Sequence, residues 1–119
     1  MNRYLLAVVD DLLFHSKIQG LLSPHGYTVK VIPDPVAAAD HARRQRPALV
    51  IIDLGLGHGD PFELIKVIKG ELALPVLAYT RHTDLTGMQK AMALGCDKVV
   101  ARSEFFDNIA ILVESLALK

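Results

Sequence analysis

The sequence has little of what several protein classes require. Its single cysteine, Cys96, excludes a disulfide within the chain and fits a reducing compartment and a buried structural thiol. The 13 basic residues balance the 13 acidic residues, which excludes a broad basic surface for nucleic acid or an acidic membrane. The apolar run at 5–9 is stopped by Asp10 and Asp11, too early for a signal-peptide core or a bilayer span. We therefore expect a soluble, cytoplasmic protein without direct nucleic-acid or membrane contact.

The sequence does have enough apolar material for one folded unit. Hydrophobic residues make up 51% of 119 residues, which is sufficient for a core without disulfides or metals. No internal repeat, low-complexity tract or linker interrupts the chain. We expect residues 1–119 to form a single domain.

Short apolar runs alternate with longer stretches of helical spacing. This alternation is typical of a parallel sheet covered by helices on both faces. The apolar runs predict strands at 4–9, 27–32, 48–53, 75–79 and 97–101. We therefore predict an α/β fold of five βα units, a doubly wound five-stranded parallel sheet with right-handed crossovers.

Capping residues and apolar stripes mark the helices between these strands. Asp34 before Pro35 and Asp60 before Pro61 predict two helix starts, with Glu63 as the capping-box partner of Asp60. The last helix is predicted to begin with a cap at Ser103. The apolar stripes are Phe14, Ile18, Leu21 and Leu22; Leu64, Ile65, Ile68 and Leu72; Leu85, Met88 and Met92; and Phe105, Phe106, Ile109, Leu112, Val113 and Leu116.

Polar residues stand at the carboxyl ends of four predicted strands, where ligands collect in this class of fold. They are Asp10 and Asp11, Asp53, Thr80 and Arg102. Each acid or hydroxyl has a structural explanation when taken alone: a helix cap, a loop start or a turn hydrogen bond. Three carboxylates at one edge, however, repel one another unless a cation neutralises them, and hard oxygen ligands suit magnesium.

A carboxylate in such a place has a chemical use. Once a metal ion and a cationic side chain screen the phosphoryl oxygens, a carboxylate attacks phosphorus and forms an aspartyl phosphate. Asp53 is the natural candidate for that role.

Several segments resemble the receiver domains of two-component response regulators. LLAVVDD at 5–11 resembles the opening strand with its paired acids. DLGLGHGDP at 53–61 is similar to the pattern D-L-x-L-P-x-x-D-G, with Gly57 in place of the proline and Pro61 in place of the glycine. The fourth strand ending in Thr80 and the segment 93–97 also match in order. The resemblance covers essentially the whole chain.

The resemblance implies a flavodoxin-like receiver fold with strand order 2-1-3-4-5, acting in phosphorelay signal transduction. Asp53 is then the acceptor of a phosphoryl group from a histidine kinase or phosphotransfer protein. Magnesium is then held by Asp11, Asp53 and the Gly55 carbonyl, with Asp10 acting through water, and Thr80 binds a phosphoryl oxygen. The product is a signal, so we expect a response-regulator phosphoprotein and not an enzyme.

The family also suggests where partners bind. The surface of the fourth helix, fifth strand and fifth helix commonly meets a downstream protein or a second receiver. Ile111 and Leu118, seven residues apart on the otherwise polar face of the last helix, predict a contact on that surface. Packing at the chain end is the alternative explanation.

Three positions depart from the family pattern. Arg102 and Ser103 stand where the family has Lys-Pro, and the planar guanidinium differs from a compact ammonium group. Arg81 follows Thr80 where a small residue is usual, and Val99 stands at the aromatic switch position. We expect Arg102 to screen the phosphoryl oxygens, with Arg81 as the alternative.

Other functions stay open at this point. A pseudo-receiver would bind its partner without phosphorylation, with Arg81 and Arg102 neutralising Asp53. A small aspartate-dependent phosphatase also forms an acyl phosphate, but Asp53-Leu54-Gly55 lacks the second acid of its D-x-D motif. A flavodoxin-like electron carrier shares the fold but needs a phosphate-binding loop after the first strand. The retained acids favour the phosphorylated receiver.

Overall fold

The computed structural model describes residues 2–119 and contains one sheet of five parallel strands in the order β2-β1-β3-β4-β5. The predicted fold class and strand order are confirmed. Each predicted strand limit lies within one residue of the observed one. The strands are β1 (Tyr4–Val8), β2 (Thr28–Val31), β3 (Leu49–Asp53), β4 (Val76–Thr80) and β5 (Lys98–Ala101).

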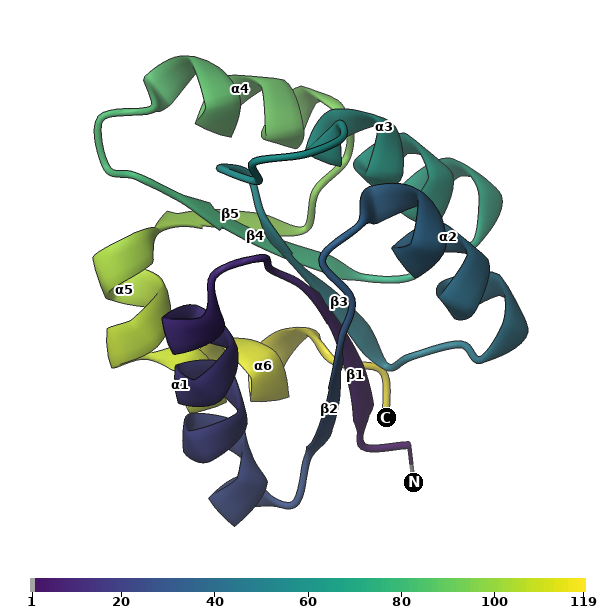
Figure 1. Cartoon of the computed structure of the whole chain (residues 1–119), viewed down its shortest axis with the longest axis vertical. Helices are drawn as coiled ribbons and strands as arrows, with labels where there is room; N and C mark the ends of the chain where they lie inside the picture. Colours follow the sequence, from purple (N-terminus) through teal and green to yellow (C-terminus); the bar gives the residue numbers. More distant parts are fainter. Residues whose placement is uncertain (1) are drawn as a thin grey trace.

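Helices cover both faces of the sheet (Figure 1). On one face lie α1 (Leu12–Leu22), α5 (Arg102–Asp107) and α6 (Ile109–Leu116); on the other lie α2 (Pro35–Arg44), α3 (Pro61–Lys66) and α4 (Leu85–Ala93). A 3₁₀ turn, η1 (Ser23–His25), follows α1, and a π-helical turn, η2 (Val67–Glu71), extends α3. None of the helices in residues 2–119 has the length and apolar character needed to cross a bilayer.

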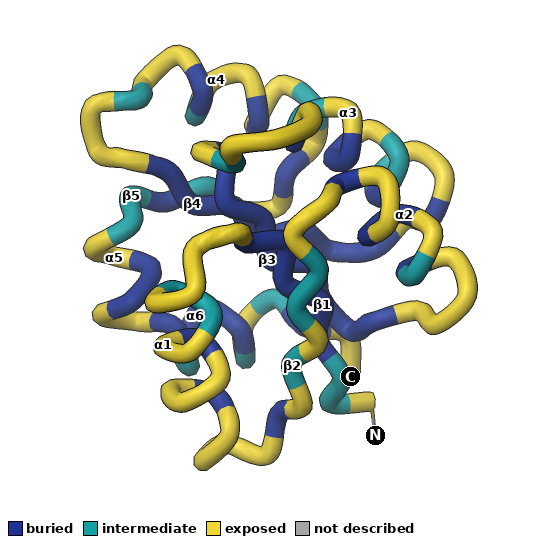
Figure 2. Tube along the Cα trace, viewed as in Figure 1, coloured by how far each residue is buried: buried dark blue, intermediate teal, exposed yellow. Residues whose placement is uncertain are grey.

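The central strands are buried (Figure 2), and their side chains belong alternately to two hydrophobic cores. In β3, Leu49 and Ile51 face the core under α1, α5 and α6, whereas Val50 and Ile52 face the core under α2, α3 and α4. Because of this alternation, a side chain at the carboxyl end of a strand lies on the same face as the residue two positions before it.

Two of the predicted helix starts are confirmed, and two capping details are wrong. Asp34 accepts a hydrogen bond from the Ala37 N–H at 2.9 Å, and Asp60 accepts one from the Phe62 N–H at 2.9 Å. Glu63 does not complete a capping box, because its carboxylate pairs with Lys66 at 3.1 Å. Ser103 caps nothing: α5 begins one residue earlier, with Ala101 at the cap position and no side-chain hydrogen bond.

Some apolar stripes also differ from the prediction. The last helix breaks at Asn108, where the backbone leaves the helical region (φ −129°, ψ 23°), although its aromatic and aliphatic face is buried as expected. In α4, Leu85 and Met92 are exposed, and the helix packs through Gly87 and Ala91 instead. Gly87 leaves room for the side chain of Asp84, which caps the helix, a role that the spacing of large apolar residues does not reveal.

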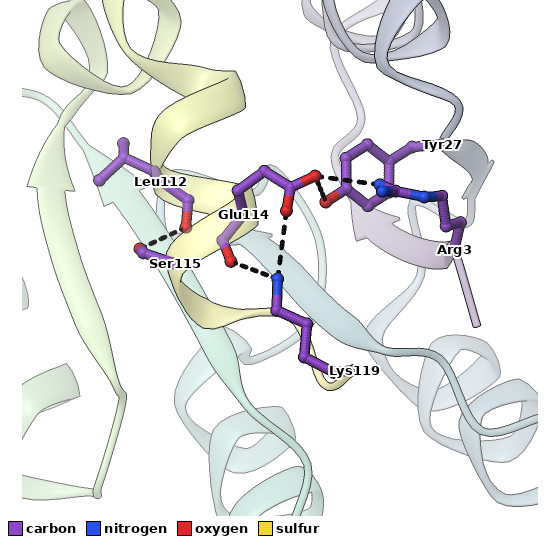
Figure 3. Close-up of polar contacts among 6 residues, drawn as sticks. All are labelled: Arg3, Tyr27, Leu112, Glu114, Ser115 and Lys119. Atoms are coloured by element: carbon purple, nitrogen blue, oxygen red, sulfur yellow. Dashed lines mark hydrogen bonds and ion pairs between the residues drawn. The ribbon is translucent and has the colours of Figure 1, made fainter. Parts of the chain in front are cut away.

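A polar cluster joins the two ends of the chain at the amino-terminal edge of the sheet (Figure 3). Glu114 on α6 accepts a hydrogen bond from the Tyr27 hydroxyl at 2.6 Å and pairs with Arg3 at 3.0 Å. Its other carboxylate oxygen pairs with Lys119 at 3.1 Å. Hydrogen bonds from Tyr27, Arg3 and Lys119 hold the pKa of Glu114 at about 2. We call these four residues the Glu114 clamp.

Candidate functional site

The polar residues predicted at the strand ends are brought to one edge of the sheet. Asp53 ends β3 and Thr80 ends β4, while Asp10 follows β1 and Arg102 opens α5. The charges of Asp10 and Arg102 both act on Asp53: Arg102 lowers its pKa and Asp10 raises it. These groups therefore share one electrostatic environment.

Asp53 is almost fully buried, with 3% of its surface exposed. Its Oδ1 accepts a hydrogen bond from the Gly55 N–H at 2.8 Å. Burial is the largest influence on this carboxyl group and raises its pKa, and the Gly55 N–H and the charge of Arg102 lower it in part. A buried carboxylate with few hydrogen bonds keeps lone pairs available for chemistry.

The paired acids after β1 are each held by backbone amides. Asp11 Oδ1 caps α1, accepting hydrogen bonds from the N–H groups of Leu13 at 2.8 Å and Phe14 at 3.2 Å. Asp10 Oδ2 accepts one from the Gly57 N–H at 2.7 Å. A proline at position 57 has no N–H to give. The departure of Gly57 from the family pattern thus creates a contact that the family's proline cannot make.

The donor chemistry of this edge fits magnesium, because the carboxylates and the Gly55 carbonyl are all hard oxygen ligands. The side chains are not gathered as a ready cage, however. Within residues 2–119, no three Asp, Glu, His or Cys side chains lie close enough together to hold a metal ion. Since one oxygen of each acid is taken by a backbone N–H, an ion here would draw much of its coordination from water.

Thr80 is buried, but its hydroxyl is turned toward α4. It donates a hydrogen bond to Asp84 Oδ2 at 2.8 Å, and Asp84 Oδ1 accepts from the Gly87 N–H at 3.0 Å to cap α4. One carboxylate therefore links the strand end to the start of the helix. Sequence reasoning missed Asp84, although Asp84 ahead of the apolar Leu85 is a recognisable capping signal.

The two candidate arginines line one hollow of about 370 Å³, together with His82, Thr83 and Ser103. Neither Arg81 nor Arg102 makes an ion pair with any described residue. The Arg102 guanidinium lies over the Phe14 ring, 4.9 Å from its centroid, and its Nε is buried without a partner. The charge of Arg102 is one of the main influences that lower the pKa of Asp53, which favours Arg102 as the screening cation.

Tyr79 is the site residue that sequence reasoning overlooked. It lies in the core beneath α1 and α5, on the opposite side of β4 from Thr80, which turns to α4. That is the face on which Asp53 also lies, because Asp53 pairs with Tyr79 in the register of β3 and β4. Strand alternation combined with this register would have identified it.

The apolar pair predicted to mark a partner surface does not lie against α4 or β5. Ile111 is 71% exposed and lines a hollow with His25 of η1, whereas Leu118 lines a small crevice with Arg3 and Tyr27. Both residues are exposed, as expected, but each lines a different hollow. The shared contact stays a prediction, and Leu118 lies beyond the end of α6 at Leu116.

Comparison with known proteins decides the family. The family model of the response regulator receiver domain matches residues 5–114. The chain belongs to this receiver-domain family. Receiver domains are parts of two-component regulatory systems, and this match gives no support to a phosphatase or an electron carrier.

Known relatives of this receiver domain are response regulators. The DNA-binding response regulator MtrA of Mycobacterium tuberculosis is 26% identical over 102 residues, which is 86% of this chain and 45% of MtrA. The transcriptional regulatory protein CseB of Streptomyces coelicolor is 27% identical over 110 residues, 92% of this chain and 46% of CseB. The receiver domain spans about half the length of the curated relatives it matches.

Solved structures agree with the fold. The receiver domain of NtrX from Brucella abortus superposes with a TM-score of 0.84 at 23% identity, covering 94% of this chain and 96% of that one. The chemotaxis protein CheY4 of Vibrio cholerae gives a TM-score of 0.85 at 20% identity, covering 98% and 99%. Both confirm the flavodoxin-like receiver architecture.

Proposed function

We propose that this receiver domain accepts a phosphoryl group on Asp53 and passes the signal on by protein contact. The observation that carries the proposal is the setting of Asp53. It is a buried carboxylate at the carboxyl edge of the sheet, with the unpaired cation Arg102 within electrostatic reach. This combination suits a nucleophile that attacks phosphorus at a screened site.

The transfer itself is a displacement at phosphorus. One carboxylate oxygen of Asp53 forms a bond to phosphorus while the bond from phosphorus to the donor breaks, and the leaving group keeps the bonding electron pair. Arg102 screens the phosphoryl oxygens, and Thr80 donates to one of them after giving up its hydrogen bond to Asp84. Magnesium, held by Asp11, Asp53 and the Gly55 carbonyl with Asp10 through water, supplies further charge neutralisation when bound.

The donor in this proposal is a phosphohistidine on a kinase or phosphotransfer protein. The receiver is placed in the cytoplasm, where such donors act, and is given no direct role in nucleic-acid binding because its charges balance. Its output partner is a downstream protein or a second receiver, engaged through α4, β5 and the following helices.

The deciding experiment is mass spectrometry after incubation with acetyl phosphate and magnesium. We expect one phosphoryl group on the native chain and none on Asp53→Asn or in the presence of a chelator. Glu63→Gln, which alters an exposed acid paired only with Lys66, is the matched control and should be phosphorylated normally. No uptake by the native chain, together with normal partner binding, would establish the pseudo-receiver function instead.

A further inference from the structure

The hydroxyl of Tyr79 is a buried polar group that lacks a hydrogen-bond partner. Tyr79 is 0% exposed, and its hydroxyl oxygen makes no hydrogen bond within residues 2–119. Buried hydroxyl groups are nearly always paired, because an unpaired one loses its bonds to water and gains nothing in return. The position of this hydroxyl therefore needs an explanation.

The sheet places this side chain beside Asp53. In the parallel pairing of β3 and β4, Asp53 and Tyr79 are register partners, and the Leu54 N–H donates to the Tyr79 carbonyl at 2.9 Å. Ile51 and Leu77, each two residues earlier, lie in the same core as Tyr79. Because side chains alternate along a strand, Asp53 shares that face.

Neighbouring aromatic rings hold the ring of Tyr79 in one orientation. It stacks on Phe105, with 4.4 Å between centroids and 22° between planes. Phe14 stands edge-on at 6.3 Å and Phe106 lies at 5.7 Å. A ring packed on several sides keeps its hydroxyl in place, so a hydrogen bond with Asp53 forms through a small adjustment of the carboxylate and not of the ring.

The charges that face the Tyr79 hydroxyl identify it as a donor. A phenol with an ordinary pKa is already protonated at neutral pH, and burial, followed by the negative charge of Asp53, raises the pKa of Tyr79 further. The phenol thus stays protonated at neutral pH. Asp53 Oδ1 is already bound to the Gly55 N–H, which leaves Oδ2 as the free acceptor on this face.

We propose that the Tyr79 hydroxyl donates a hydrogen bond to Asp53 Oδ2 and so positions the carboxylate for phosphoryl transfer. The role in transfer rests on the proposed function. When Asp53 forms its bond to phosphorus through one oxygen, the other becomes the carbonyl oxygen of the acyl phosphate. The hydrogen bond from Tyr79 fixes which oxygen attacks, and no proton leaves the tyrosine.

The first test is spectroscopic and needs no phosphate. The chain has three tyrosines, so labelling of tyrosine Cζ with ¹³C gives three NMR signals that Tyr→Phe variants assign. We expect Asp53→Asn to move the Tyr79 signal and leave those of Tyr4 and Tyr27 in place, because only Tyr79 loses a charged acceptor. A Tyr79 signal that does not respond to Asp53→Asn overturns the proposal.

The second test is kinetic and uses a matched control. Tyr79→Phe removes only the hydroxyl and keeps the aromatic stack, while Tyr4→Phe removes another buried, unpartnered hydroxyl, one that lies at the start of β1. With acetyl phosphate and magnesium, we expect Tyr79→Phe to lower the maximal phosphorylation rate about fivefold, the effect of one hydrogen bond. The half-saturating donor concentration should stay constant, and Tyr4→Phe should match the native chain.

These results separate the two proposals. Equal maximal rates for Tyr79→Phe and Tyr4→Phe overturn the positioning role while phosphorylation of Asp53 stands. A native chain that takes up no phosphate refutes the proposed function, and a Tyr79 signal that still moves in Asp53→Asn upholds the hydrogen bond itself.

Discussion

Asp53 is a charged group held in a place that favours its neutral form. Burial and the charge of Asp10 raise its pKa, and the Gly55 N–H, Arg102 and Tyr79 oppose them. An acid whose pKa is raised on folding destabilises the folded state once the pH is above its unfolded value. At the residue scale, the site is therefore costly in the absence of a counter-ion.

This cost predicts a gain of stability when the charge is removed. In magnesium-free buffer at pH 7, we expect Asp53→Asn to melt a few degrees above the native chain, and the difference should shrink as the pH falls and Asp53 is protonated. Thermal denaturation followed by circular dichroism measures both effects. An equal or lower melting temperature for the variant would show that the buried charge does not destabilise the folded state.

The two candidate arginines should differ in effect. We expect Arg102→Ala to slow phosphorylation by acetyl phosphate about tenfold, the scale for loss of one hydrogen bond to a charged group. Arg81→Ala should change the rate less than twofold, because Arg102 already supplies a charge that lowers the pKa of Asp53. Arg102→Lys should preserve or improve the rate. Phosphorylation followed by mass spectrometry compares the three variants, and a larger effect at Arg81 would reverse the assignment.

The Gly57 N–H should weaken magnesium binding, because its hydrogen bond takes up Asp10 Oδ2. Gly57→Pro removes the N–H that binds Asp10 Oδ2 at 2.7 Å, and we expect magnesium to bind roughly fivefold more tightly as a result. Gly57→Ala keeps the N–H and serves as the control. NMR titration with magnesium gives the affinities, and equal values for the two variants would count against this role of the amide.

At the scale of elements, α4 is connected to the site through Asp84. Asp84→Ala removes the cap on the Gly87 N–H and the acceptor for Thr80, so we expect a loss of about 1 kcal/mol in the free energy of unfolding. Asp84→Asn keeps an oxygen for the cap and should lose less. Urea denaturation measures both values. If Asp84→Ala is as stable as the native chain, the helix start does not depend on this carboxylate.

The strands were predictable because buried parallel strands are continuous apolar runs with sharp polar ends. The caps at Asp34 and Asp60 were predictable for a similar reason, since their partners lie within three residues. Ser103 and Glu63 failed because a local signal competes with contacts made elsewhere: α5 starts directly from β5, and Glu63 pairs with Lys66. The hydrogen bonds of Asp10 and Thr80 depend on how loops meet in space, which spacing alone does not determine.

At the scale of the whole molecule, the Glu114 clamp introduces a dependence on acid. Its partners hold the pKa of Glu114 at about 2, below the ordinary value of 4.5, so the clamp stabilises the fold fully above pH 4.5. Its contribution is lost as the pH falls from there towards 2. We expect Glu114→Gln to melt below the native chain at pH 7, and the gap to close across that window.

The control for this prediction is Glu63→Gln, whose exposed carboxylate pairs only with Lys66. Its melting temperature should follow the native chain at every pH, since exposed pairs of this kind contribute little. Differential scanning calorimetry from pH 7 to pH 2 compares the three proteins. A constant gap between Glu114→Gln and the native chain would assign the loss to packing and not to charge.

The Glu114 clamp also connects the two ends of the described chain through noncovalent contacts. Arg3 and Lys119 bind the same side chain, which brings the two ends of the described chain to one edge of the sheet (Figure 1). A short linker could therefore join them, and a circularly permuted chain, opened at an exposed connection instead, should keep this architecture. The order in which the strands are synthesised would change, while the edge that carries Asp53 would stay intact.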